Sequence, residues 1–342
     1  MQKYKNILIC YGTRPEVIKL SPLINLLNKQ NKINCRTVFT GQHTDLFNDV
    51  KDLVPKPHYK LSIMKKNQSL NDILINISKG FIKILNNFNP DIVIVQGDTS
   101  TVLVCALNAF YSNIEVGHVE AGLRTFDLTS PYPEEGNRQL VSRISHYNWA
   151  PTDIAFNNLK KEGLQNIFLT GNTIVDACKA FNYKIKYKNK ILITIHRREN
   201  FGDKIIKIFQ ELNELAIIYP NLNFIFPMHP NPNIQKHKKI LSNINIIQPL
   251  KYPQLLKLLS EVKFVISDSG GIQEECASFK KKILVCRDNT ERPEGIDSGF
   301  AKIIGTNLIE NFDWANNNYK WEGKNPYGDG NAAQNIIKSL GL

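Results

Sequence analysis

Residues able to bind an anion gather between Ser267 and Gly295. The triplet Ser269-Gly270-Gly271 follows an apolar strand and precedes a helix, so it would present free backbone N–H groups and the positive end of a helix dipole, which suit a phosphate. Glu275 lies about one turn into that helix, and Arg287 and Arg292 follow the next strand. The segment is typical of a site for a phosphorylated sugar or a nucleotide, although an ordinary β-turn-α joint with a solvated charge cluster has the same pattern.

Three carboxylates are candidates for acid–base chemistry. Asp98 follows one expected strand, Glu120 follows the next, and Glu134 opens a helix. Ligands of parallel α/β sheets bind beyond the carboxyl ends of the strands, where these side chains would meet. Each also has a structural explanation, because Asp98 could cap the next helix and acids are favourable at a helix N-terminus. Their convergence on one sheet edge favours a catalytic role.

Basic residues and histidines lie at further strand ends. Arg14 follows the first strand and Lys19 lies one turn into the next helix, where each could face a ligand or the solvent. His196 is followed by two arginines, a combination that indicates an anion site, and His229 follows another strand. The glycines form no GxGxxG motif, so no nicotinamide cofactor is expected.

These side chains are positioned by an alternation of short β-rich runs with longer helical runs, which occurs twice. In the first half we expect strands at 5–11, 33–40, 91–96, 114–119 and 168–170, and helices at 15–29, 70–87, 101–110 and 134–145. After a polar, basic stretch at 182–189, strands are expected at 190–195, 223–227, 244–247, 262–266 and 283–286, and helices at 204–218, 252–260 and 272–279. The pattern predicts an α/β fold of two Rossmann-like, doubly wound parallel-sheet domains facing a cleft.

The domain boundaries follow from the same alternation. Residues 1–172 form the expected N-terminal domain with the carboxylates, and residues 173–324 form the second domain with the anion site. Residues 325–342 begin with a Gly-Asp-Gly turn that would let the terminal helix pack elsewhere. A chain of 342 residues is consistent with two domains.

Composition excludes several classes of protein. Apolar residues make up 42% and charged residues 22%, which is incompatible with global disorder. No apolar run reaches the roughly 18–20 residues of a membrane span, and Ile7–Tyr11 is too short for a signal peptide, so a cytoplasmic protein without membrane insertion is expected. The six cysteines are isolated and show no metal-ligand spacing, so neither a metal nor a disulfide framework is expected.

The net charge of +12 raises nucleic acid as a partner. The lysines are scattered, however, and their local clusters carry neither stacking aromatics nor a DNA-reading motif. These clusters are Lys184–Lys190, Lys236–Lys239 and Lys280–Lys282. We therefore interpret them as solvated surface and expect no nucleic-acid partner.

The chain resembles the non-hydrolysing UDP-N-acetylglucosamine 2-epimerases over nearly its whole length. The motifs that carry the resemblance, in that family's order, are GTRPEVIKLSPL, GQH, QGDTST, GHVEAGLRTFD, SPYPEEGNRQ, GNTIVDA, HRREN, SDSGGIQEE, RDNTERPEG and NPYGDG. The resemblance implies the GT-B-like fold of many nucleotide-sugar glycosyltransferases, with the C-terminal helix returning to the first domain. It also implies a homodimer without a cofactor, an isomerase that interconverts UDP-N-acetylglucosamine and UDP-N-acetylmannosamine, and a role in bacterial surface polysaccharide synthesis.

The resemblance also implies roles for individual residues. Asp98, Glu120 and Glu134 match the acid–base set, and His196 matches a position that serves both catalysis and binding. The positions that match the holders of the diphosphate are Arg14, His196, Ser269, Gly270, Gly271 and Arg292. Glu275 matches a contact to the uridine ribose, and Lys19 matches another site position. Gln42, His43 and His229 match a second, regulatory UDP-N-acetylglucosamine site.

Three other functions share parts of this pattern. A GT-B glycosyltransferase would transfer the sugar to an acceptor, and a hydrolysing epimerase would release N-acetylmannosamine and UDP. Hydrolysing relatives typically open with a GTRADFGK-like motif, whereas this chain has Gly12-Thr13-Arg14-Pro15-Glu16, which favours the non-hydrolysing branch. A non-catalytic sensor would not need Asp98, Glu120 and Glu134. The sequence leaves open whether the substrate carries a modified sugar.

Overall fold

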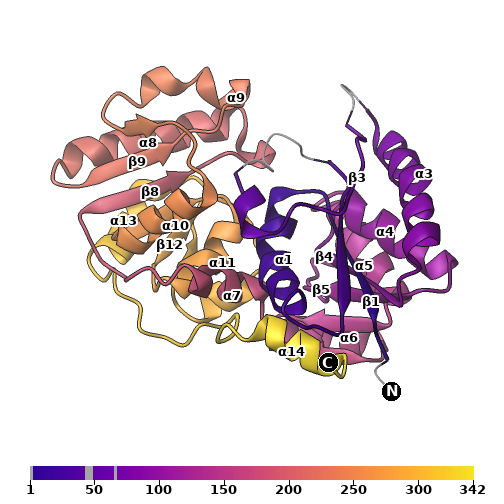
Figure 1. The fold of residues 1–342 in the computed structure, drawn as a ribbon. Coiled ribbons are helices and arrows are strands. Elements are labelled where there is room, and N and C mark those ends of the chain that lie inside the picture. The colour runs from indigo at the N-terminus through magenta and orange to yellow at the C-terminus, as the bar shows by residue number, and fades with distance from the viewer. Residues whose placement is uncertain (1–2, 43–48, 65–67) are drawn as a thin grey trace. The chain divides into compact units, whose positions relative to one another are not determined.

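The computed structural model describes residues 3–42, 49–64 and 68–342, which form two compact units. Unit 1 comprises Met1–Ala177 and Tyr327–Leu342, and unit 2 comprises Cys178–Pro326. The sequence analysis placed the corresponding boundaries after residues 172 and 324. Each unit is built on a parallel sheet with interleaved helices, as expected for two doubly wound α/β halves (Figure 1).

Unit 1 has a seven-stranded parallel sheet among its described residues, in the order β3-β2-β1-β4-β5-β6-β7. Its strands are β1 (Asn6–Tyr11), β2 (Asn34–Phe39), β3 (Tyr59–Lys60), β4 (Ile92–Gln96), β5 (Glu115–Val119), β6 (Tyr147–Ala150) and β7 (Ile167–Leu169). Its helices are α1 (Arg14–Leu27), η1 (Lys51–Leu53), α3 (Leu70–Phe88), α4 (Ser100–Tyr111), α5 (Glu134–Ile144), α6 (Asp153–Lys161), α7 (Thr173–Ala180, which runs into unit 2) and α14 (Ala332–Ser339). The strand order reverses direction between β1 and β4.

Successive side chains in the strands of unit 1 are apolar and point to alternate faces of the sheet, so helices can cover both faces. Leu8, Cys10, Val93 and Val95 pack against α3, α4 and α5 in one buried cluster. Helices α1 and α14 lie on the opposite face (Figure 1). A buried parallel sheet of this kind requires apolar side chains on both faces, which explains the continuous apolar runs in the sequence.

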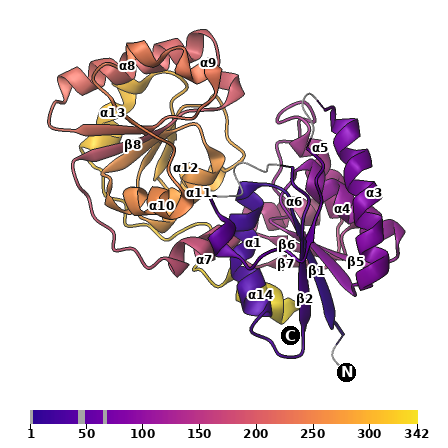
Figure 2. The same ribbon diagram turned by 45° about the horizontal axis from the view of Figure 1, so that its top comes forward.

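The last helix, α14, is fixed to unit 1 by polar contacts at both ends. Backbone N–H groups of Ala332 and Ala333 donate to Asp176, at 3.1 and 2.9 Å, so a side chain from α7 replaces the missing cap of the helix. At the other end, the indole N–H of Trp149 donates to Ser339 at 2.8 Å. Residues 327–342 therefore belong to unit 1 although unit 2 precedes them in the chain (Figure 2).

Unit 2 repeats the same topology. Its described residues form a six-stranded parallel sheet in the order β10-β9-β8-β11-β12-β13, which reverses between β8 and β11. Its strands are β8 (Lys190–Thr194), β9 (Asn223–Pro227), β10 (Asn245–Ile247), β11 (Phe264–Ser267), β12 (Ile283–Val285) and β13 (Ala301–Ile303). Its helices are η2 (Arg198–Asn200), α8 (Asp203–Ile218), α9 (Pro232–Gln235), η3 (Lys238–Ile240), α10 (Tyr252–Glu261), α11 (Gly270–Ser278), α12 (Pro293–Asp297) and α13 (Leu308–Asn316).

One basic cluster of unit 2 is not solvated surface, so our interpretation of Lys280–Lys282 was wrong. Lys281 has no exposed surface, donates to the carbonyl of Val262 at 2.8 Å, and lies 3.8 Å above the ring of Tyr187. Lys282 is also buried and lies over Trp314. These ammonium groups are stabilised by carbonyl oxygens and aromatic faces, which a composition count does not reveal.

Among the helices in the described part of the chain, none has the length and apolar character needed to cross a bilayer.

Candidate active site

The predicted site residues of unit 1 lie where its strand order reverses, between β1 and β4, and at the end of the adjacent β5. In open parallel sheets this reversal is the usual place for a ligand. Arg14 is the first residue of α1, which follows β1, and its guanidinium lies 3.7 Å from the carboxylate of Asp49. Asp98 follows β4 and Glu120 follows β5.

Glu120 is a buried carboxylate on a strained backbone. Its φ of 65° lies in the left-handed region, which costs a non-glycine residue on the order of 1–3 kcal/mol. Its carboxylate accepts hydrogen bonds from the Lys19 ammonium and the Gln96 amide, and the Asn172 amide lies at 3.5 Å. Lys19 is only 5% exposed, so the solvated alternative for this side chain is wrong. Strain held by such contacts is typical of functional sites.

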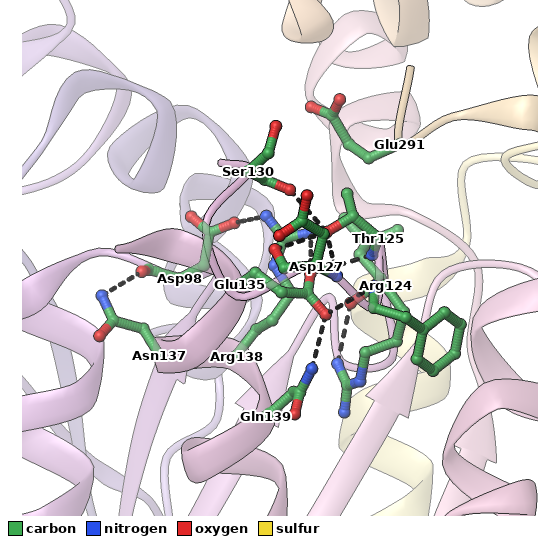
Figure 3. A network of polar contacts seen from close by, with 12 residues as sticks. Asp98, Arg124, Thr125, Asp127, Ser130, Glu135, Asn137, Arg138, Gln139 and Glu291 are labelled. Carbon is green, nitrogen blue, oxygen red and sulfur yellow. Dashed lines mark hydrogen bonds and ion pairs between the residues drawn. The ribbon is translucent and has the colours of Figure 1, made fainter. Parts of the chain in front are cut away.

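Asp98 is held in place while remaining partly open. One carboxylate oxygen accepts from Arg138 at 2.6 Å, and its backbone carbonyl accepts from the Asn137 amide at 2.8 Å (Figure 3). The side chain remains 28% exposed. Thr99, not Asp98, is the N-cap of α4 and accepts from the N–H of Val102 at 3.4 Å, so the capping explanation of Asp98 is wrong.

Neighbouring acids at the start of α5 have different environments. Glu135 is fully buried and accepts from the N–H groups of Thr125 and Phe126, at 3.0 and 3.2 Å (Figure 3). Burial opposes ionisation of Glu135, but the bond from Gln139 and those backbone bonds outweigh it and lower its pKa. Glu134 is half-buried, and its side chain makes no hydrogen bond or ion pair to any described residue. Glu135 therefore holds a loop, while Glu134 remains available for chemistry.

Sequence reasoning missed Glu16, a buried carboxyl group that links two turns of unit 1. It accepts from the N–H of Gly12 at 2.5 Å and from the hydroxyl of Thr99 at 2.5 Å. Burial raises its pKa to about 7. The GTRPE motif contains Glu16, and its position three residues after the N-cap Thr13 is a capping-box signature that could have identified it.

In unit 2, the predicted phosphate turn forms the start of α11. Ser269 is the N-cap, and Gly270 and Gly271 are the first two helical residues. The neighbouring Asp268 has no exposed surface and accepts from the N–H groups of His196 and Arg197, at 2.9 and 2.8 Å. This carboxylate, which sequence reasoning missed, therefore fixes the turn after β8 beside the start of α11.

The two predicted histidines of unit 2 lie together. The rings of His196 and His229 are stacked, with centroids 5.8 Å apart and an interplanar angle of 18°. The His196 Nδ1 lies 3.7 Å from Asp268, and the His229 Nδ1 accepts from the N–H of Asn231 at 3.1 Å. His196 remains 41% exposed and is thus accessible to a ligand.

Arg292 lies against the start of α11. A Cβ atom added to Gly270 would lie 2.5 Å from a terminal nitrogen of this guanidinium, so only glycine permits the approach. Arg292 donates to Glu274 at 2.7 Å and to Glu291. Glu274 and Glu291 were not predicted.

Three arginines surround Glu291. Arg287 donates to it at 2.9 Å, and Arg197 lies 3.9 Å away. Burial opposes ionisation, but Arg292, Arg287 and Arg197 outweigh it and hold the pKa of Glu291 well below its usual range. The arrangement is a guanidinium cluster beside a helix N-terminus, which suits a phosphorylated ligand.

Three further residues were predicted as part of a binding site, namely Glu275, Gln42 and His43. Glu275 lies in α11, is 5% exposed, and neighbours Tyr252, whose pKa is raised by burial and then by this carboxylate. Gln42 accepts from the hydroxyl of Thr101 at 2.8 Å, which ties it to the start of α4. His43 lies outside the described residues. Across residues 3–42, 49–64 and 68–342, no cluster of three or more metal-ligating side chains occurs.

The chain matches proteins of known activity over nearly its full length. The family model for UDP-N-acetylglucosamine 2-epimerase matches residues 25–341. The UDP-N-acetylglucosamine 2-epimerase of Campylobacter jejuni is 43% identical, with 98% of this chain and 97% of that protein covered.

Solved structures of UDP-GlcNAc 2-epimerases are also similar to this chain over nearly its full length. The crystal structure of UDP-GlcNAc 2-epimerase from Neisseria meningitidis bound to UDP-GlcNAc has a TM-score of 0.90 and 40% identity, covering 98% of this chain and 99% of that one. The Methanocaldococcus jannaschii enzyme in complex with UDP-GlcNAc and UDP has a TM-score of 0.83 and 36% identity, with the same coverage.

Proposed function

Because this chain belongs to the UDP-N-acetylglucosamine 2-epimerase family, we propose that it interconverts UDP-N-acetylglucosamine and UDP-N-acetylmannosamine without hydrolysis. The observation that carries the proposal is the set of carboxylates in unit 1. Glu120 is buried on a strained backbone, Asp98 is clamped yet partly open, and Glu134 has no partner among the described residues. A protein that only bound the nucleotide sugar would not need three such groups.

The proposed reaction proceeds by elimination and re-addition. The C2–H bond of the sugar has no adjacent carbonyl to make it acidic, so abstraction of that proton alone would be difficult. A base instead removes the C2 proton while the bond from C1 to the UDP oxygen breaks, which forms 2-acetamidoglucal and UDP. The UDP oxygen then adds back to C1, and an acid delivers a proton to the opposite face of C2. The route requires a base, an acid and stabilisation of departing UDP.

We assign the proton steps to Asp98, Glu120 and Glu134. Arg138 occupies one oxygen of Asp98, and the other makes no hydrogen bond within the described residues and can exchange a proton. Lys19 lies beside Glu120, so charge that develops during a proton transfer there has a nearby cation.

We assign the UDP moiety to unit 2. The N–H groups at the start of α11 and the guanidinium of Arg292 would hold the diphosphate, with His196 as a further donor. Glu275 would accept from the ribose hydroxyls. The relatives bind UDP-GlcNAc and UDP, which supports a UDP-sugar as the ligand. Cytoplasmic location and a place in bacterial surface polysaccharide synthesis are further proposals, supported by family membership alone.

Incubation with UDP-N-acetylglucosamine in deuterated water tests the proposal. We expect deuterium at C2 of both epimers, because each passage through the glucal replaces that proton, and only trace free UDP. Mass spectrometry and NMR of the sugar provide the measurement. A glycosyltransferase would leave C2 unlabelled. A hydrolysing epimerase would release N-acetylmannosamine and UDP in equal amounts, and either result would contradict the proposal.

We also propose a homodimer formed through the outer surface of α3 and α4. Its exposed apolar residues are Leu74, Ile75, Ile82, Phe110 and Tyr111. A hydrogen bond of 3.0 Å between Ser78 and Asn108 joins the two helices, and Leu74, Ile75 and Ile82 lie about one turn from Ser78 along α3. Exposed apolar residues on neighbouring helices commonly mark an interface, and a second copy of the chain presents a matching surface.

Replacing Ile82 with aspartate is expected to convert the dimer to a monomer, because dimerisation would bury an unpaired charge. Light scattering after size-exclusion chromatography measures the mass. Ile217→Asp, at an exposed apolar position on α8 of unit 2, is the matched control and should leave the mass unchanged. If wild type is monomeric at micromolar concentration, the dimer proposal fails.

A further inference from the structure

His118 is a buried histidine of unit 1 that the proposed chemistry does not use. It lies on β5, two residues before Glu120, and has no exposed surface. Its Nε2 lies 2.7 Å from the carbonyl oxygen of Gly97. Because a carbonyl oxygen can only accept, Nε2 carries the hydrogen and donates it.

The surroundings keep this imidazole neutral. Burial lowers its pKa to about 4, and Arg124 and Arg138 add to the effect against the opposing influence of the Gly97 bond. A neutral ring protonated at Nε2 has an unprotonated Nδ1, which is an acceptor. No described group donates to that Nδ1.

An unpaired acceptor in the interior is costly, so His118 is a poor choice for packing alone. A leucine or phenylalanine would fill the space without that cost. What only a donor at the Nε2 position supplies is the hydrogen bond to Gly97. The contribution of His118 is therefore the hydrogen bond that holds the Gly97 peptide.

That peptide connects two carboxylates. The N–H of Gly97 donates to the carbonyl of Val119, the residue before Glu120, at 3.1 Å. Gly97 has a φ of 83° and immediately precedes Asp98. With its N–H bound to the end of β5 and its carbonyl bound by His118, the Gly97 unit has little rotational freedom. The Asn137 amide holds the next carbonyl, that of Asp98, at 2.8 Å.

We propose that His118 is a positioning residue that locks the Gly97 peptide and thereby sets the orientation of Asp98 relative to Glu120. This inference rests on the proposed acid–base function of those two carboxylates. His118 itself neither contacts the reacting atoms nor exchanges a proton. Misplacement of an acid or base by a fraction of an ångström to one ångström is sufficient to slow a proton transfer substantially.

The test compares a substitution that removes the hydrogen-bond donor at Nε2 with one that retains a donor near that position. His118→Leu removes the donor, and we expect kcat to fall by about 10-fold or more with KM changed by less than about twofold. His118→Gln places an amide N–H near the original Nε2, and we expect it to recover most of kcat. The shape of the pH–rate profile should stay that of wild type in both variants, because the imidazole does not titrate near neutral pH. A missing limb would mean that His118 transfers a proton and would overturn the positioning role.

The control is Tyr59→Phe, which removes a partly buried hydrogen bond of the same unit, donated by Arg36 at 2.7 Å, on the edge strand β3. It should lower the melting temperature without lowering kcat. If His118→Leu does not fold, His118→Asn replaces it, because the shorter amide reaches the Nδ1 position and not the Nε2 position. The inference would be refuted if the glutamine variant had the same kcat as the leucine variant, or as the asparagine variant that replaces it. Wild-type turnover is measured first, so absence of C2 exchange in wild type would refute the proposed function separately.

Discussion

Replacing Glu120 with glutamine is expected to lower the rate of C2 deuterium exchange by about 10³-fold, because a positioned acid or base commonly contributes that much. The amide has nearly the same shape but cannot take or hold a proton at neutral pH. UDP affinity should change by less than about threefold, because the protein groups that would hold the diphosphate are assigned to unit 2. Exchange monitored by NMR and UDP binding monitored by calorimetry separate the two effects.

The control for this variant must account for the buried hydrogen bonds of Glu120. An amide nitrogen placed against either the Lys19 ammonium or the Gln96 amide leaves a donor unpaired, which costs about 1–3 kcal/mol of stability. Gln96→Leu damages the same network but retains the carboxylate. It should lower the melting temperature comparably and reduce exchange far less. Equal losses of exchange in the two variants would show that the intact network, and not the carboxylate, is what matters.

Replacing Gly270 with alanine is expected to weaken UDP binding by about 100-fold, the equivalent of one or two charge-assisted hydrogen bonds. The new Cβ would lie 2.5 Å from a terminal nitrogen of Arg292 and 2.9 Å from its Cζ, so the guanidinium must move from the start of α11. That movement also strains its bonds to Glu274 and Glu291. Calorimetric titration with UDP measures the loss.

Gly271→Ala is the matched substitution in the same turn. A Cβ at Gly271 meets no atom within 4 Å, so this variant should keep the melting temperature of wild type, whereas Gly270→Ala should lower it. The loss of UDP affinity should also be smaller for Gly271→Ala. Identical affinities for the two variants would contradict the role given to Arg292.

Much of the fold and part of the site follow from local sequence signals. Apolar runs of strand length alternating with longer helical runs predicted two parallel sheets, because backbone periodicity is a property of neighbouring residues. The same signals placed Asp98, Glu120 and the Ser269-Gly270-Gly271 turn at strand ends, where the structure has them. Within each parallel sheet the carboxyl ends of the strands lie at the same edge, so no tertiary information was required.

The partner of each charged group was decided only by the tertiary structure. Lys19 and Glu120 are 101 residues apart in the chain, and Thr99 and Glu16 are 83 apart, so no local pattern joins them. For the same reason Lys281 looked solvated although it is buried.

The sequence by itself determined the alternation of strands and helices, the family and the types of residue at the strand ends, although it missed β3, β6 and β13. Only the packed structure distinguished the partly open Asp98 and Glu134 from the fully buried Glu135, and it alone assigned His118 to the Gly97 peptide. The physical reason is that burial and pairing depend on which segments lie against each other, and these are set by long-range strand order and helix packing rather than by neighbouring residues.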